Sequence, residues 1–216
     1  MSAFRLDGIR FYHDEIRDLL VAWVALGLAF SVFIFISTGR AVFPDIVGAV
    51  SSPLFARVFA ASALTVGVGF LLHELAHKVV AVRFGQVASF KADYRMLALC
   101  IGAAFAGFLF AAPGAVYHRG RITQRQGGLV SVAGPLTNVV LVGVFLPFVF
   151  LTGFVGQVGA LGVLINAFLA AFNMLPFGPL DGKSVAAWSK PVFAVVFVGS
   201  ALVAVGSFLL VGFPTF

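Results

Sequence analysis

Two histidines and a glutamate within five residues have the spacing of a metal site. The segment His73-Glu74-Leu75-Ala76-His77 has the form H-E-x-x-H. On a helix, histidines four positions apart lie on one face and can share a metal ion, while Glu74 lies on the adjoining arc as a general base. With four histidines and two glutamates in 216 residues, this pattern would arise by chance roughly 0.0007 times, so the match is informative.

Two explanations without a metal remain open for this segment. The histidines could bond to neighbouring carbonyls, and Glu74 could pair with Lys78 one helical turn along. Both are weakened because ionisable side chains within an apolar run are costly and usually functional. We therefore expect a catalytic zinc site, which takes three protein ligands and leaves one position for water.

The third ligand must come from another part of the chain. His13 and His118 lie in polar stretches typical of surface histidines, and Cys100 lies among small apolar residues, where we interpret it as a filler of the core. Asp181 is the strongest acidic candidate because it follows an apolar run directly, within the segment Asn173-Met-Leu-Pro-Phe-Gly-Pro-Leu-Asp-Gly182. The other acids lie in charged or loop contexts: Asp7, Asp14, Asp18, Asp45 and Asp93.

The segment around Asp181 also predicts an interruption of helical structure. Pro176 and Pro179 lack an N–H and disfavour helix at the preceding residue, and Gly178 permits backbone conformations that other residues resist. An unwound helix end frees backbone groups that can pair with an extended peptide. We therefore predict that Pro176, Gly178 and Pro179 bind substrate. A plain turn between two membrane spans is the alternative interpretation.

Composition indicates where these residues must work. The chain is 61% apolar and only 10% charged, with a mean hydropathy of +1.10, so it lacks the charge to cover a soluble surface. One cysteine excludes a disulfide scaffold. The apolar runs lack the alternation of a membrane β-barrel, which predicts an all-α polytopic membrane protein. We attribute the net charge of +6 to membrane topology and expect no nucleic-acid partner.

Six apolar runs are candidates for membrane spans. They cover residues 19–38, 58–82, 96–113, 129–151, 158–175 and 192–212, and residues 10–18 are expected to start the first helix at the interface. If residues 96–113 cross the membrane, the basic residues divide seven to seven, whereas a re-entrant path divides them twelve to two. The positive-inside rule favours the second arrangement, with the N-terminus in the cytoplasm. The sequence therefore predicts five spans and one re-entrant or hairpin element.

This topology and the metal site agree with each other. With a re-entrant third run, Asp181 emerges on the same side of the membrane as His73 and His77. We expect a single membrane-embedded domain over residues 1–216, with a catalytic core at about 58–185 and flanking spans at 19–38 and 192–212.

The two motifs together resemble the site-2 protease family of intramembrane zinc metalloproteases. The resemblance covers about residues 65 to 185 and includes Ala133-Gly134-Pro135, which is similar to a Gly-Pro signature of that family. It implies that His73, His77 and Asp181 bind one zinc ion per chain and that Glu74 is the catalytic base. It further implies that Asn173 positions the substrate carbonyl or stabilises the oxyanion. Lys183 departs from the second glycine that many members carry after the Asp-Gly pair.

The resemblance implies hydrolysis of peptide bonds within or near transmembrane helices of membrane-protein substrates. The expected partners are such a helix and the lipid bilayer, in a prokaryotic plasma membrane with the active site open to the cytoplasm; the sequence does not indicate an oligomeric state. The main alternative is a zinc-binding membrane protein without protease activity, such as a transporter or a chaperone-like protein. A transporter would more often show two broken helices in related halves, whereas this chain has one marked break and no internal repeat. A structural membrane subunit, which would bind no metal, is the third alternative.

Overall fold

The described residues contain five helical segments that are long and apolar enough to cross a membrane. The computed structural model describes residues 3–6, 8–40, 45–109, 113–212 and 216. The five segments are α1 (His13–Ser37), the rod of α3 (Pro53–Ser62), η1 (Ala63–Gly67) and α4 (Val68–Arg83), α6 (Gln124–Phe145) with η2 (Leu146–Phe150), α7 (Gly153–Asn173) and α9 (Lys190–Val211). Short elements complete the fold: α2 (Ile46–Ala49), α5 (Tyr94–Phe105), α8 (Asp181–Trp188), and the strands described below. The predicted fold class, an all-α polytopic membrane protein, is confirmed.

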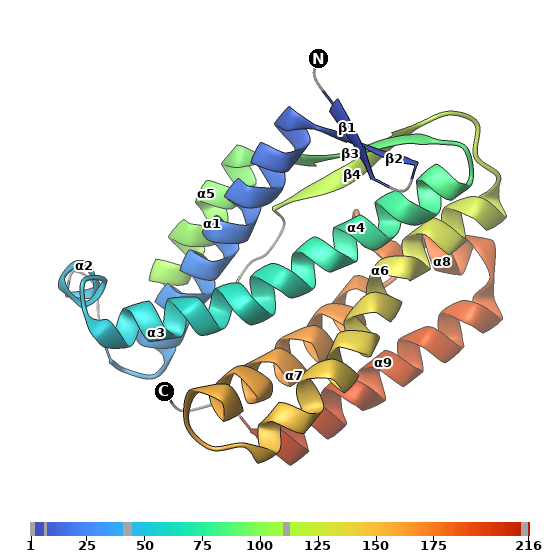
Figure 1. The fold of residues 1–216 in the computed structure, drawn as a ribbon. Helices are drawn as coiled ribbons and strands as arrows, with labels where there is room; N and C mark the ends of the chain where they lie inside the picture. Colours follow the sequence, from blue (N-terminus) through green and yellow to red (C-terminus); the bar gives the residue numbers. More distant parts are fainter. Residues whose placement is uncertain (1–2, 7, 41–44, 110–112, 213–215) are drawn as a thin grey trace.

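The second span lies at the centre of the helix packing (Figure 1). The α3–η1–α4 rod contacts α1 on one side, while α4 packs against α6 on another. Buried apolar side chains from α1, the rod, α5 and α7 form the main core. In contrast, α9 lies at the periphery against α7 and α8, and only 11% of its most apolar window is buried. The rod that carries the H-E-x-x-H motif is thus, with α1, the most buried of the five spans.

A π-helical turn, η1, joins the two halves of the rod. In this wide turn the carbonyl of Ala63 accepts the backbone N–H of Val68 and also the indole N–H of Trp23 from α1, the latter at 2.8 Å. Gly67 is required beside this contact, because a Cβ at that position would overlap the indole ring. The bond from Trp23 therefore ties the first span to the second just ahead of α4.

The segments on either side of the third apolar run lie side by side, as the charge distribution predicted. Strand β3 (Val87–Ala92) pairs antiparallel with β4 (Gly114–Arg119), so that Ala92 lies opposite Gly114. The N–H of Asp93 donates to the carbonyl of Pro113 at 3.0 Å, which closes the base of the excursion. Between the strands, α5 packs along α1 (Figure 1). Residues 110–112 of this run lie outside the described part of the chain.

The N-terminal stretch differs from its prediction. Strand β1 (Ala3–Leu6) and strand β2 (Ile9–Tyr12) form a hairpin, and α1 begins only at His13. Gly8 occupies the turn with φ of 81°, a conformation that favours glycine. The expected helix start at residue 10 is therefore wrong, because the hairpin satisfies the backbone groups of residues 9–12 instead.

Candidate metal centre

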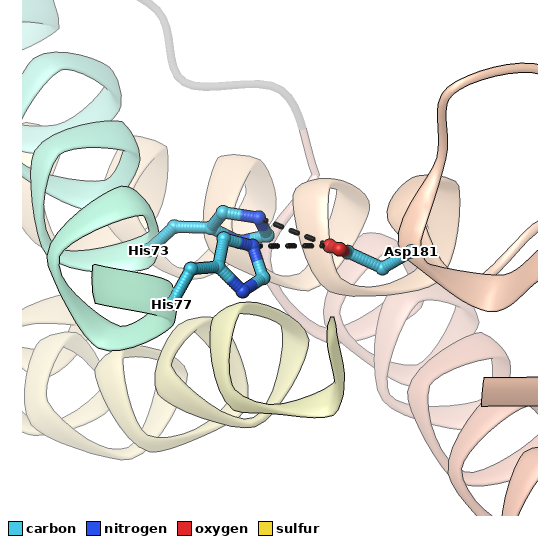
Figure 2. Close-up of side chains that lie close together, drawn as sticks. All are labelled: His73, His77 and Asp181. Atoms are coloured by element: carbon cyan, nitrogen blue, oxygen red, sulfur yellow. Dashed lines mark ion pairs between the residues drawn. The ribbon is translucent and has the colours of Figure 1, made fainter. Parts of the chain in front are cut away.

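His73, His77 and Asp181 form the one group within the described residues that could hold a metal ion. The two histidines lie one turn apart on α4, and Asp181 is the first residue of α8. Asp181 Oδ2 lies 3.2 Å from His73 Nε2 and 3.3 Å from His77 Nε2. Figure 2 shows the carboxylate facing both imidazole rings across the gap between the two helices. The structure thus brings together the three residues that the sequence proposed as ligands, although their role as ligands stays a prediction.

Both imidazole rings are oriented by acceptors on α6. His73 Nδ1 donates to Asn138 Oδ1 at 2.6 Å, and His77 Nδ1 donates to the carbonyl of Val130 at 2.8 Å. Because an oxygen acceptor requires a proton on Nδ1, Nε2 is the nitrogen that carries the lone pair when each ring is neutral, and both Nε2 atoms face Asp181. This is the tautomer that a metal ligand needs, so the donor set fits zinc.

The orientation of Asn138 is fixed in turn by its own partners. Its amide Nδ2 donates to Asn166 Oδ1 at 2.9 Å and to the carbonyl of Gly69 at 3.3 Å. Asn166 Nδ2 donates to the carbonyl of Gly162 within α7 at 2.9 Å. This chain of hydrogen bonds connects three spans, so the amide oxygen of Asn138 must face His73.

Gly134 gives α6 its close approach to the two histidines. A Cβ at this position would lie 2.5 Å from His73 Nε2 and 2.5 Å from His77 Nε2. Any side chain on residue 134 would therefore occupy the space where the ring nitrogens converge. The close contact with the two rings thus explains why residue 134 of the Ala133-Gly134-Pro135 segment is a glycine.

The predicted unwound segment carries Asp181 to the site. Helix α7 ends at Asn173, two residues earlier than expected, and Gly178 adopts φ of 62° in the following turn. Pro176, Gly178 and Pro179 are exposed, so their substrate-binding role stays a prediction. Burial by itself raises the pKa of Asp181, but the charge of the His77 ring and the hydrogen bonds from both rings, when these are protonated, outweigh burial and hold the pKa below its ordinary value of 3.8. The carboxylate is therefore ionised at neutral pH and available as a ligand.

Glu74 is buried beside this group and faces the strand β4. Its Oε2 accepts the backbone N–H of Val116 at 3.1 Å, which leaves Oε1 as the free proton acceptor. The alternative pairing of Glu74 with Lys78 is wrong, because Lys78 forms a buried ion pair with Glu15 at 2.6 Å. Its role as a base stays a prediction.

The remaining candidates lie away from the three-residue group. Asn173 turns its amide back onto its own helix, where Nδ2 donates to the carbonyl of Leu169 at 3.0 Å. His118 is exposed on β4 and Cys100 is buried on α5. His13 starts α1 and is exposed. None of these side chains belongs to the metal-binding group found among the described residues.

Sequence reasoning missed the groups that orient the site. The carbonyl of Val130 carries no sequence signal, because every residue has a backbone carbonyl. Glu15 and Asp18 lie in the stretch that was expected to start the first helix at the membrane interface, and the structure buries both. A clue to Glu15 was available, since a lysine within an apolar run requires a buried acid as its partner.

Known proteins include clear relatives of this chain. A protein of Methanocaldococcus jannaschii, named "Putative zinc metalloprotease MJ0611", is 38% identical over 194 residues, which cover 87% of this chain and 91% of that protein. A Bacillus subtilis protein, named "Putative zinc metalloprotease YwhC", is 35% identical over 141 residues, which cover 55% of this chain and 64% of that protein. No family model and no solved structure matches the chain. The names of these relatives, together with the His73-His77-Asp181 group, confirm the prediction of zinc as cofactor.

Proposed function

The chain belongs to the zinc metalloprotease family of these two relatives, and from this premise we propose that it is an intramembrane protease of the site-2 type. In this proposal it hydrolyses peptide bonds within or near transmembrane helices of membrane-protein substrates. Its partners are then a substrate helix and the bilayer.

The position of the candidate ligands along α4 is the observation that carries the proposal. His73 and His77 lie ten and six residues before the end of α4 at Arg83, which corresponds to about 15 Å and 9 Å along the helix axis. The rod that contains them is apolar and long enough to span a membrane. The reactive centre would therefore lie below the end of the helix, at a depth that a peptide in water does not reach.

Each side chain of the site can be given a task in peptide hydrolysis. Zinc held by His73, His77 and Asp181 would polarise the scissile carbonyl and lower the pKa of water to about 7. Glu74 takes the proton of the attacking water on Oε1 and delivers it to the leaving amine. Asn173 can contact the substrate carbonyl only after its amide leaves the carbonyl of Leu169.

The edge of β4 offers a place for an unwound substrate. The N–H of Val116 points away from β3 and toward Glu74, so the unpaired edge of β4 borders the catalytic base. An extended peptide can add to such an edge as a further strand. A substrate helix must unwind in any case, because its carbonyls are already hydrogen-bonded. The exposed loop with Pro176, Gly178 and Pro179 would then bind the peptide from the side of Asp181.

Charge asymmetry supports an orientation with this end of the molecule in the cytoplasm. With a re-entrant third run, twelve of the fourteen basic residues fall on the side of the N-terminus, and only Arg40 and Arg57 fall opposite. The active site would open to the cytoplasm of a prokaryotic cell.

The test is to locate the cut in a single-span reporter protein. Purified enzyme and reporter are reconstituted together in liposomes, and the products are identified by mass spectrometry. We expect new termini inside or next to the apolar segment of the reporter, loss of cleavage with a zinc chelator, and recovery on adding zinc. Cuts confined to water-exposed loops would overturn the intramembrane assignment. Binding of one zinc without cleavage of any helix in a panel would favour the non-proteolytic alternative.

A further inference from the structure

Two carboxylates on α1 bind the free edge of β3. Glu15 Oε1 accepts the backbone N–H of Phe90 at 3.1 Å, and Asp18 Oδ2 accepts that of Ala92 at 3.2 Å. Asp18 Oδ1 also accepts the hydroxyl of Tyr94 at 2.6 Å. Phe90 and Ala92 alternate along the strand, so both N–H groups lie on the edge that does not pair with β4. Glu15 and Asp18 therefore act on the sheet as a backbone partner strand would.

Lys78 connects this carboxylate pair to the helix of the metal centre. Its Nζ lies 2.6 Å from each carboxylate oxygen of Glu15 and donates to the carbonyl of Arg10 at 2.7 Å. The Nζ also lies 3.9 Å from the centre of the Phe11 ring. The side chains of Lys78 and Glu15 are 1% and 0% exposed. The ammonium group of Lys78 and both carboxylate oxygens of Glu15 thus have polar partners inside the protein.

These contacts form a closed ring that begins and ends on α4. Lys78 binds Glu15, and Glu15 binds the N–H of Phe90 on β3. Phe90 lies directly opposite Val116 on β4, and the N–H of Val116 binds Glu74, one turn before Lys78. The height of the two-stranded sheet relative to α4 is therefore fixed at two points, one on each edge of the sheet.

We propose that Glu15, Asp18 and Lys78 are positioning residues for peptide hydrolysis, which hold the edge of β4 in register with Glu74. This inference rests on the proposed protease function. A substrate strand that pairs with β4 would be aligned by the position of β4. The distance from its scissile carbonyl to Glu74 would therefore depend on the same contacts. Misplacement of reacting groups by 1 Å costs about 100-fold in rate, so a sheet released from α1 would leave the zinc ligands intact and slow the reaction.

Different residues hold the metal ligands in place. An effect on the position of the sheet can therefore be measured separately from an effect on zinc binding. His73 and His77 are oriented from α6, and Asp181 is delivered by α8. Among the described residues, no hydrogen bond or ion pair joins the ring from Lys78 to Glu74 to the groups on α6 that orient the two histidines. Replacing a buried ion pair with apolar residues of similar volume is often neutral for stability. A double substitution can therefore remove the ring while the protein stays folded.

The experiment compares two disruptive variants with a matched control. The first is Glu15→Met/Lys78→Met, which removes both charges together and with them the acceptor for Phe90. The second is Asp18→Asn, which keeps the shape of Asp18 but removes its charge and one of the two oxygens that accept from Ala92 and Tyr94. The control is Asp14→Leu on the same helix, because the Asp14 side chain is 68% exposed. Readouts are bound zinc, amide hydrogen exchange at residues 87–119, and kcat/KM for the single-span reporter.

We expect the double variant to keep one zinc per chain, to lose exchange protection at the amides of Phe90 and Val116, and to lose roughly 10- to 100-fold in kcat/KM. Asp18→Asn should show the same pattern more weakly, with the loss of protection centred on Ala92, and Asp14→Leu should match wild type. Wild-type kcat/KM in both disruptive variants would overturn the inference, as would a loss of activity that follows zinc loss in both. If wild type does not cleave at all, the proposed function fails, whereas unchanged exchange at Val116 would refute the positioning role by itself.

Discussion

Substitution of Gly134 by alanine should remove zinc from a protein that otherwise keeps its fold. The added Cβ would lie 2.5 Å from the Nε2 atoms of His73 and His77, whereas ordinary van der Waals contact begins at 3.4 Å. The rings or helix α6 must therefore move apart by the difference, about 0.9 Å. Zinc tolerates deviations of only ~0.2 Å around a Zn–N distance of ~2.0–2.1 Å. The displacement is several times larger than the metal site can absorb.

The expected loss is at least about 100-fold in zinc affinity, or ~2.8 kcal/mol of binding free energy. Zinc affinity is measured by competition with a chromophoric chelator, and the fold is checked by circular dichroism and thermal unfolding. Gly143→Ala is the matched control, because a Cβ on that residue of α6 meets no atom within 4 Å. Alanine there should bind zinc normally and unfold at the same or a higher temperature. Zinc binding by Gly134→Ala with wild-type affinity would refute the placement of α6 against the two rings.

Three further predictions concern Asn138, Trp23 and the effect of zinc on stability. Asn138→Leu removes the acceptor that orients His73 and should weaken zinc binding ~10- to 100-fold, whereas Asn138→Asp keeps an acceptor and should bind more tightly than Asn138→Leu; equal affinities in a chelator competition would contradict this role. Trp23→Phe loses the indole N–H that binds the carbonyl of Ala63 and should lower the free energy of unfolding by about 1 kcal/mol, and no change in a denaturant titration would argue against it. Removing zinc with a chelator should lower the melting temperature, and re-addition at 100-fold over Kd should restore ~2.7 kcal/mol; a melting temperature independent of zinc would count against the site.

The pair of histidines in the metal-binding group could be predicted from the sequence, because their arrangement depends only on the number of residues between them. The positions of His73 and His77 on one helical face follow from the four-residue interval alone. The approach of Asp181 to them could be predicted because the charge count required a re-entrant third run, which the pairing of β3 with β4 displays. The position of Asp181 was therefore predicted from the membrane topology and not from a local sequence pattern.

The partners of Lys78 could not be predicted by the same local rules. Residues four apart on a helix often pair, which suggested Glu74, but a buried ammonium group needs several acceptors at once. Glu15 and the carbonyl of Arg10 supply them from the N-terminal hairpin and the start of α1. Their proximity is a consequence of tertiary packing across more than sixty positions of sequence.

The N-terminal hairpin was missed for a different reason. Its strands are four residues each, too short for a clear alternation of apolar and polar side chains. An Asp-Gly dipeptide at residues 7–8 is a known hairpin signal, and it could have identified the turn. The charged stretch that follows, residues 10–18, was interpreted as a helix start at the membrane interface, whereas Glu15 and Asp18 within it are buried and bind β3.

Comparison of wild type with Glu74→Gln in one cleavage assay tests the central claim most directly. Glutamine keeps an oxygen that can accept the N–H of Val116, so the fold and the metal ligands stay in place while the base is lost. With both proteins loaded to one zinc per chain, we predict that the variant cleaves a single-span reporter at least ~100-fold more slowly than wild type. Equal cleavage rates for the two zinc-loaded proteins would contradict the assignment of Glu74 as the base and, with it, the proposed mechanism.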